Sequence, residues 1–130
     1  MVDGMLNLIP AAKVGHIGMY RNEETLEPVE YYCKLPSDIN EREVFVLDPM
    51  LATGSSMELA YEALRTKGHP AHIHVASIIA SKQAIEYLQR KMPDDITTIW
   101  VAAVDDELDD HSYIVPGLGD AGDLSYGEKE

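Results

Sequence analysis

The stretch VFVLDPMLATGSS, residues 44–56, predicts a strand, a tight loop and the start of a helix. Its first four residues form an apolar run of high β-propensity, which favours a strand covered on both faces. Asp48 ends this run, and Pro49 is expected to block further pairing because it has no N–H group. Residues 53–56 then offer accessible backbone N–H groups at a helix N-terminus, which favours anion binding. Asp48 is unexpected beside a plain phosphate but suits a ligand that also carries hydroxyls, such as a ribose phosphate.

Two glycine-containing segments must be distinguished from better-known nucleotide motifs. The loop at residues 53–56 is not a Walker A motif, because no lysine follows Gly54. Helix-terminus physics alone favours a phosphate-binding loop but leaves a plain strand-to-helix turn open. The segment PGLGDAG, residues 116–122, is only superficially similar to a dinucleotide fingerprint, because it does not precede a helix within a βαβ unit. Its Asp120 and the nearby Asp123 fit turn positions and ligand contacts equally well.

Strands and helices alternate after the opening stretch. The predicted elements are two amphipathic helices, at residues 57–67 and 82–91, and two apolar strands, at residues 71–80 and 96–104. Ser81 should cap the second helix. This order predicts an α/β fold with a parallel sheet and right-handed crossovers. Ligands bind such sheets at the carboxyl ends of the strands, where Asp48 and Asp105 lie.

The chain on either side of this unit is less regular. Residues 1–9 carry a helical stripe of apolar side chains without a convincing N-cap. The strand-like pieces at 14–20 and 29–34 are expected to pair as a hairpin arm, about residues 14–36, with a charged tip. The glycine-rich tail, residues 112–127, is expected to be a loop that presents backbone groups.

Composition is that of an ordinary but acidic globular domain. With 130 residues, a single domain over 1–130 is expected. The net charge of −13 argues against nucleic-acid and anionic-membrane partners, which need basic surface. We interpret the acidic run as a solvated loop: Asp105, Asp106, Glu107, Asp109 and Asp110.

Cysteine and histidine usage favours an intracellular protein without metal clusters. Cys33 is the only cysteine, so no intramolecular disulfide can form, and a reducing compartment fits. His72 and His74 share one face of a strand, but no acidic partner has ligand spacing. The start shows no signal-peptide pattern, and no apolar run approaches the ~20 residues that span a bilayer. A cytoplasmic location is therefore expected.

Three motifs resemble those of uracil phosphoribosyltransferases. They are GMYRNEETLEPVEYYCKLP from Gly18, DPMLATGSS from Asp48 and YIVPGLGDAGD from Tyr113. They follow the family order with family-like spacing, over essentially the whole chain. The resemblance implies a type I phosphoribosyltransferase fold, a parallel sheet flanked by helices with a protruding β-hairpin. It also implies a glycosyltransferase of pyrimidine salvage that converts uracil and 5-phosphoribosyl-1-pyrophosphate (PRPP) to UMP and pyrophosphate.

The resemblance assigns site residues in three groups. Arg21 would meet the pyrophosphate through its guanidinium fork, and Asp120 would contact the phosphoribosyl ligand or its Mg²⁺ shell, so these two are the catalytic candidates. Asp48 would hold ribose hydroxyls, and residues 53–56 would cradle the 5′-phosphate. The PRPP loop as a whole would be Asp48, Pro49, Met50, Leu51, Ala52, Thr53, Gly54, Ser55 and Ser56. Uracil would be read mainly by backbone groups of Ile114, Gly119, Asp120 and Ala121.

The implied reaction requires few metal ligands from the protein. Displacement at the anomeric carbon develops oxocarbenium character, so positioning and nearby carboxylates would drive it. Mg²⁺ would be held mainly through the pyrophosphate, and no protein metal site is expected. GTP is a candidate effector.

The chain departs from the family pattern in several places. The family carries an N-terminal part before the residue matching Met1, including a strand and an arginine loop, so the chain is interpreted as N-terminally truncated. A sheet lacking a strand exposes an edge and apolar surface, which predicts self-association. Ser55 replaces a usual glycine and requires a negative φ, and Leu124 replaces a usual basic residue. The alternative function is a non-catalytic nucleotide-binding or ribose-phosphate-binding or assembly module of the same fold.

Overall fold

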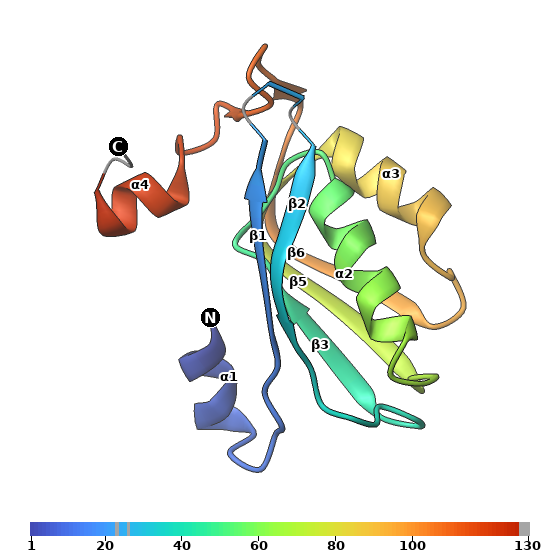
Figure 1. The fold of residues 1–130 in the computed structure, drawn as a ribbon. Coiled ribbons are helices and arrows are strands. Elements are labelled where there is room, and N and C mark those ends of the chain that lie inside the picture. Colours follow the sequence, from blue (N-terminus) through green and yellow to red (C-terminus); the bar gives the residue numbers. More distant parts are fainter. Residues whose placement is uncertain (23, 26, 128–130) are drawn as a thin grey trace.

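The computed structural model describes residues 1–22, 24–25 and 27–127, drawn in Figure 1. Its helices are α1 (Val2–Leu8), α2 (Ser55–Arg65), α3 (Lys82–Lys91) and α4 (Ala121–Tyr126). Its strands are β1 (His16–Arg21), β2 (Pro28–Lys34), β3 (Glu43–Leu47), β4 (Met50–Leu51), β5 (His72–Ser81), β6 (Thr97–Asp105), β7 (Glu107–Leu108) and β8 (Ile114–Val115).

Strand β5 is the centre of a parallel sheet, which confirms the predicted α/β fold. β3 pairs with its first half, and β4 pairs with its far end, where Leu51 lies opposite Ala80. β6 runs along the other side of β5 up to the pair formed by Ser81 and Asp105. The carboxyl ends of β4, β5 and β6 therefore meet at one end of the sheet.

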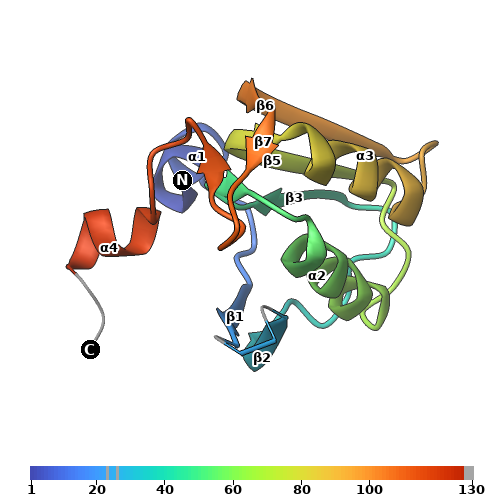
Figure 2. The ribbon, with the colours of Figure 1, turned by 90° about the horizontal axis from the view of Figure 1, so that it is seen from above.

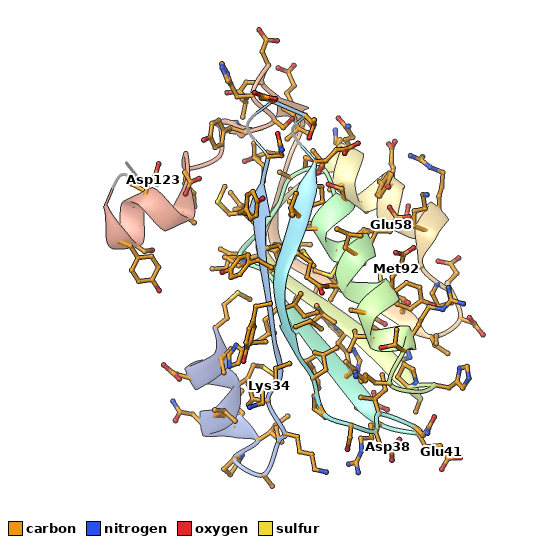
Figure 3. The ribbon with its side chains drawn as sticks, viewed as in Figure 1. Lys34, Asp38, Glu41, Glu58, Met92 and Asp123 are labelled. Carbon is orange, nitrogen blue, oxygen red and sulfur yellow. The ribbon has the colours of Figure 1, made fainter. Side chains whose placement is uncertain are left out.

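Helices α2 and α3 lie next to each other against this sheet (Figures 1 and 2). The core between helices and sheet contains Leu51, Met57, Ile73, Val75, Ala80, Ala84, Leu88 and Met92. Figure 3 labels Met92, which follows the last residue of α3. α3 begins where the sequence predicts, since the Ser81 hydroxyl accepts a 2.9 Å hydrogen bond from the amide of Ala84.

The face of the sheet away from this core is open among the described residues. Phe45 on β3 keeps 42% of its surface exposed and stacks on His74, with ring centroids 4.6 Å apart. Trp100 on β6 is 56% exposed and donates from Nε1 to Nδ1 of His74, at 3.1 Å. The prediction of a strand covered on both faces is therefore wrong for β3, because Val46 packs against the core while the neighbouring Phe45 stays exposed.

The prediction that Pro49 blocks further strand pairing is wrong. Its carbonyl accepts hydrogen bonds from the amides of Ile78 and Ile79, at 3.1 and 3.2 Å, and pairing with β5 resumes at Met50. A proline lacks only the donor, so its carbonyl can still be used where the neighbouring strand supplies two N–H groups. The result is the short strand β4, which carries the chain to the loop before α2.

The hairpin arm is confirmed as an antiparallel pair of β1 and β2. Its register shifts between Gly18 and Met19. A Cβ atom at Gly18 would lie 2.7 Å from the ring of Tyr31, so the glycine lets the tyrosine cross the strand closely. Figure 1 shows the arm beside α2, and most of β2 is exposed.

The tail is not the open loop that its glycines suggest. β7 and β8 form a small antiparallel pair, and Asp120 caps α4 by accepting from the amide of Asp123, at 2.9 Å. Figures 1 and 2 show α4 standing apart from α2 and α3, as α1 does. The glycines lie between these short elements and form the turns that separate them. Gly117 and Gly119 adopt the positive φ angles of 51° and 82° that the turns require.

Candidate functional site

Asp48 stands directly after β3, where the sequence predicts the first functional carboxylate. Its own amide donates to the carbonyl of Ala76 on β5, and its Oδ1 accepts from the amide of Met50, both at 3.1 Å. Burial raises the pKa of the Asp48 carboxyl above its ordinary value, and the hydrogen bond from Met50 opposes this shift only in part. A desolvated carboxylate with one donor has capacity to accept hydrogen bonds from ligand hydroxyls.

The loop after β4 requires glycine at one position. Gly54 is the N-cap of α2 and has a φ of 86°, which other residues rarely adopt. A Cβ atom there would also lie 3.0 Å from the ring of Tyr87 and 3.4 Å from the carbonyl oxygen of Ala84. Ser55 opens the helix and is not among the described positive-φ residues, so serine is compatible with this place in the family pattern.

Two hydroxyls and the start of α2 form the polar wall of this loop. The Oγ atoms of Thr53 and Ser55 lie 2.8 Å apart, within hydrogen-bond distance. The first amides of a helix have no acceptor within the helix and carry the positive end of its dipole. Thr53 to Ser56 thus match the donor set expected for a phosphate, although the hollow beside them, about 30 Å³, is only water-sized.

Ser81 connects the loop to α3. Its side chain is fully buried, donates to the carbonyl of Ala52 at 2.5 Å and accepts from the amide of Ala84. The sequence indicates the cap but not the bond to Ala52, because the two residues are 29 positions apart. One hydroxyl thus holds both the loop and the start of a neighbouring helix.

Glu58 forms a second brace between α2 and α3. The Tyr87 hydroxyl donates to its Oε2, and Lys91 Nζ lies 2.9 Å from its Oε1. These partners, Tyr87 first, lower the pKa of the Glu58 carboxyl. Figure 3 labels Glu58 on α2. Because the Tyr87 ring also borders Gly54, this brace fixes the wall behind the loop.

Only the first part of the predicted base-binding segment, at Ile114, lies near the carboxyl end of the sheet. Ile114 on β8 is 2% exposed, and the Gly117 amide donates to Oδ2 of Asp105, the last residue of β6. Since β5 separates β4 from β6, the ends of those two strands lie about 10 Å apart. Gly119, Asp120 and Ala121 lie at the start of α4, and none of them lines the hollow beside the loop.

Arg21 is the last residue of β1, but its side chain lies outside the described part of the chain. Its predicted contact with pyrophosphate therefore stays a prediction. Seven members of the predicted PRPP loop line the small hollow together with Met57, whereas Pro49 and Ser55 do not: Asp48, Met50, Leu51, Ala52, Thr53, Gly54 and Ser56.

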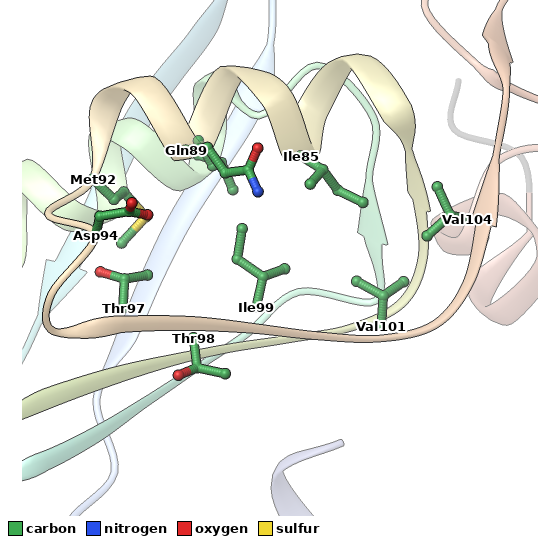
Figure 4. A pocket seen from close by; sticks show the side chains of 10 residues that line it. Ile85, Gln89, Met92, Asp94, Thr97, Thr98, Ile99, Val101 and Val104 are labelled. Atoms are coloured by element: carbon green, nitrogen blue, oxygen red, sulfur yellow. The ribbon is translucent and has the colours of Figure 1, made fainter.

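A larger hollow of about 450 Å³ lies elsewhere, between α3 and β6 (Figure 4). Ile85 and Gln89 point into it from the helix, and Ile99 and Val101 line it from the strand. It lacks glycine loops and helix N-termini, so its chemistry does not suit a phosphorylated sugar. The loop at Asp48 is the better candidate on its donors, despite its smaller volume.

The described residues contain neither a cluster of metal-ligating side chains nor a membrane-spanning helix. No group of three or more His, Cys, Asp and Glu side chains there could hold a metal ion. His72 instead pairs with the Thr98 hydroxyl and His74 with Glu43 and Trp100, in line with structural roles. Within the same ranges, no helix has the length and apolar character needed to cross a bilayer.

The fold and the loop define a phosphoribosyltransferase-like α/β protein. A purine phosphoribosyltransferase from Pyrococcus horikoshii Ot3 has the same fold, with a TM-score of 0.50 and 18% identity over 82% of this chain and 70% of that one. The AQ2163 protein from Aquifex aeolicus is more similar, with a TM-score of 0.88 and 41% identity over 98% of this chain and 59% of that one.

Sequence comparison then gives the family. The uracil phosphoribosyltransferase model matches residues 1–127. Uracil phosphoribosyltransferases from Streptococcus pyogenes serotype M49 (strain NZ131) and serotype M1 are 59% and 58% identical over 99% of this chain. The chain belongs to the uracil phosphoribosyltransferase family, which confirms the resemblance seen in its motifs. It spans about 60% of the length of these curated relatives.

Proposed function

We propose that this chain is a uracil phosphoribosyltransferase that converts uracil and PRPP to UMP and pyrophosphate in pyrimidine salvage. One observation carries the proposal beyond family membership. The half-buried Asp48 and the glycine-capped start of α2 lie on one small hollow, which pairs an acceptor for hydroxyls with donors for a phosphate. Because the chain covers about 60% of its relatives, its substrates are part of the proposal.

In the proposed binding mode, the ribose phosphate and the uracil are bound by two different segments at the carboxyl end of the sheet. Asp48 accepts hydrogen bonds from ribose hydroxyls, and the amides and hydroxyls from Thr53 to Ser56 hold the 5′-phosphate. Backbone groups at Ile114 and from Gly119 to Ala121 bind the uracil edge. Arg21 binds the pyrophosphate.

In the proposed reaction the chain positions the two substrates and supports the developing charge. N1 of uracil forms a bond to the anomeric carbon as the bond to pyrophosphate breaks, and the N1 proton leaves to solvent. The carboxylates of Asp48 and Asp120 stabilise the oxocarbenium character of the ribose. Mg²⁺ bound through the pyrophosphate would neutralise the leaving group, and the donor set fits this, since a pyrophosphate-held ion needs few protein ligands.

The remaining parts of the proposal concern location and assembly. We propose a cytoplasmic protein with residues 1–130 acting as one domain, without nucleic-acid or membrane partners. The exposed aromatic side chains of the open sheet face support a homo-oligomer. GTP is proposed as an effector on the family resemblance alone.

A non-catalytic ribose-phosphate-binding or assembly module is the second candidate. It is favoured by one observation, that Gly119 to Ala121 do not line the hollow at the loop. In that case the chain would bind UMP or ribose 5-phosphate without turnover.

Turnover separates the two candidates. The folded chain is incubated with labelled uracil, PRPP and Mg²⁺, and UMP is quantified by chromatography. UMP formation that depends on both substrates supports the enzyme. Thermal stabilisation by UMP without product would instead support the binding module, and neither result in well-folded protein would contradict both.

A further inference from the structure

Asp105 has a structural position that its surroundings in the sequence do not suggest. It belongs to the acidic run interpreted as a solvated loop, but in the structure it ends β6 and lies in register with Ser81 of β5. It is half-buried. Its Oδ2 accepts a 3.0 Å hydrogen bond from the amide of Gly117, twelve residues further along the chain. The end of the central sheet is thus joined directly to the glycine turn after β8.

That turn is tightly constrained at Gly117. The residue has a φ of 51°, and a Cβ atom there would lie 2.0 Å from the carbonyl oxygen of Ile114. The chain therefore folds back closely on β8, whose Ile114 is buried. The Gly117 amide, which needs an acceptor away from water, finds it in Asp105.

Asp109 holds the preceding segment in the same way. Its Oδ1 accepts from the amides of His111 and Tyr113, at 2.9 and 2.8 Å, and its own amide donates to the carbonyl of Tyr113. β7 and β8 pair on either side of this turn. The segment from β7 to β8 is thus internally braced, and Asp105 is the side chain that fastens its far end to the sheet.

We infer that Asp105 is a positioning residue for the base-binding segment, holding Gly117 and with it the start of this segment at the carboxyl end of the sheet. This inference rests on the proposed function. Asp105 touches no substrate in this role and acts through the backbone of Gly117. A hydrogen bond from an amide to a carboxylate is stronger than one between neutral groups, which suits a contact that must hold a loop.

The test uses three variants of the full chain. Asp105→Ala removes the acceptor, Asp105→Asn retains an acceptor oxygen without charge, and Asp110→Ala removes an exposed acid of the same run as a matched control. Two properties are measured: hydrogen exchange of the Gly117 amide by NMR, and the dissociation constants for UMP and ribose 5-phosphate. Ribose 5-phosphate lacks the base and so reports on the Asp48 loop alone.

We expect Asp105→Ala to lose affinity for UMP but not for ribose 5-phosphate. In Asp105→Ala the Gly117 amide exchanges about tenfold faster and UMP binds about tenfold more weakly, as expected for one lost charge-assisted bond. Ribose 5-phosphate binding stays within about twofold of the parent by the same argument. Asp105→Asn recovers most of both losses, and Asp110→Ala matches the parent chain.

Two results overturn the inference. One is unchanged Gly117 exchange in Asp105→Ala. The other is equal weakening of UMP and ribose 5-phosphate, which would show a general structural role. If the parent chain binds neither ligand, the proposed function fails, whereas the exchange measurement still decides whether Asp105 holds Gly117.

Discussion

At the scale of single residues, the site places ligand binding and stability in conflict. Asp48 is held where burial disfavours its charge, and only one described hydrogen bond reaches its carboxylate. Gly54 occupies a backbone conformation that a side chain would strain. Groups of this kind are typical of sites that await a ligand, because a bound ligand supplies the missing partners.

The substitution Asp48→Asn is expected to raise stability while it abolishes function. Because the folded-state pKa of Asp48 is raised, its ionised form disfavours folding, and the stability lost on ionisation is fully recovered only below its ordinary pKa of 3.8. The variant should therefore be more stable than the parent at pH 7, and this gain in the free energy of unfolding should shrink as the pH falls toward 4. Urea unfolding at several pH values measures this, and a variant less stable at pH 7 contradicts it.

The substitution Gly54→Ala should damage the loop itself. Positive φ and the contact with Tyr87 predict a loss of about 1–3 kcal/mol in the free energy of unfolding. Ribose 5-phosphate binding should weaken at least tenfold, measured by calorimetry. Gly4→Ala is the control, since no atom lies within 4 Å of a Cβ there and α1 tolerates alanine. Equal behaviour of the two variants would contradict the role of Gly54.

At the scale of elements, hydrogen bonds between neighbouring helices fix the wall of the site. The Glu58 brace joins α2 to α3, and the Ser81 hydroxyl joins the loop to α3. Both link residues that are distant in sequence. They explain how a short loop keeps its shape on a sheet with one open face.

Removing the Tyr87 hydroxyl tests the Glu58 brace. Tyr87→Phe should lower the free energy of unfolding by about 0.5–1.5 kcal/mol at pH 7. The lowered pKa of Glu58 contributes stability above its ordinary pKa of 4.5, which is lost as the pH falls through the folded-state value. The difference between variant and parent should therefore narrow toward pH 3. Tyr61→Phe on α2 is the control, and a constant difference across pH would argue against the brace.

The elements also show what the sequence could predict. Periodicity identified α2, α3, β5, β6 and the hairpin arm, because each buries one regular face or pairs locally. It missed β4, because the carbonyl of Pro49 finds partners only once β5 is in place. It missed β7, β8 and α4, which depend on aspartate side chains bonded to nearby amides. The loop at Asp48 was predictable as a local motif, but the braces from Ser81, Tyr87 and Asp105 were not, since they act across 12 to 29 residues.

At the scale of the whole molecule, one face of the sheet carries exposed aromatic side chains. Phe45, His74 and Trp100 form a continuous aromatic cluster on that face. Exposed apolar clusters of this kind promote association in water. Among the described residues, the core thus lies on the side of the helices, and the other face of the sheet is open.

Self-association through this face is expected to depend on Trp100. Sedimentation velocity should show a concentration-dependent oligomer for the parent chain, and Trp100→Lys should shift it toward the monomer. Tyr126→Lys is the control, because Tyr126 is 93% exposed on α4, away from the cluster. A monomeric parent chain, or equal effects of the two variants, would contradict the prediction.

The central claim is that the stretch from Val44 to Ser56 builds the ribose-phosphate half of a nucleotide site whose base half is the segment near Gly117. The measurement that tests it most directly is an amide chemical-shift map of the labelled chain during titration with UMP. The account predicts that shifts concentrate in residues 48–56 and 114–121 together, with one dissociation constant. Shifts around the hollow between α3 and β6, or in only one of the two segments, would contradict it.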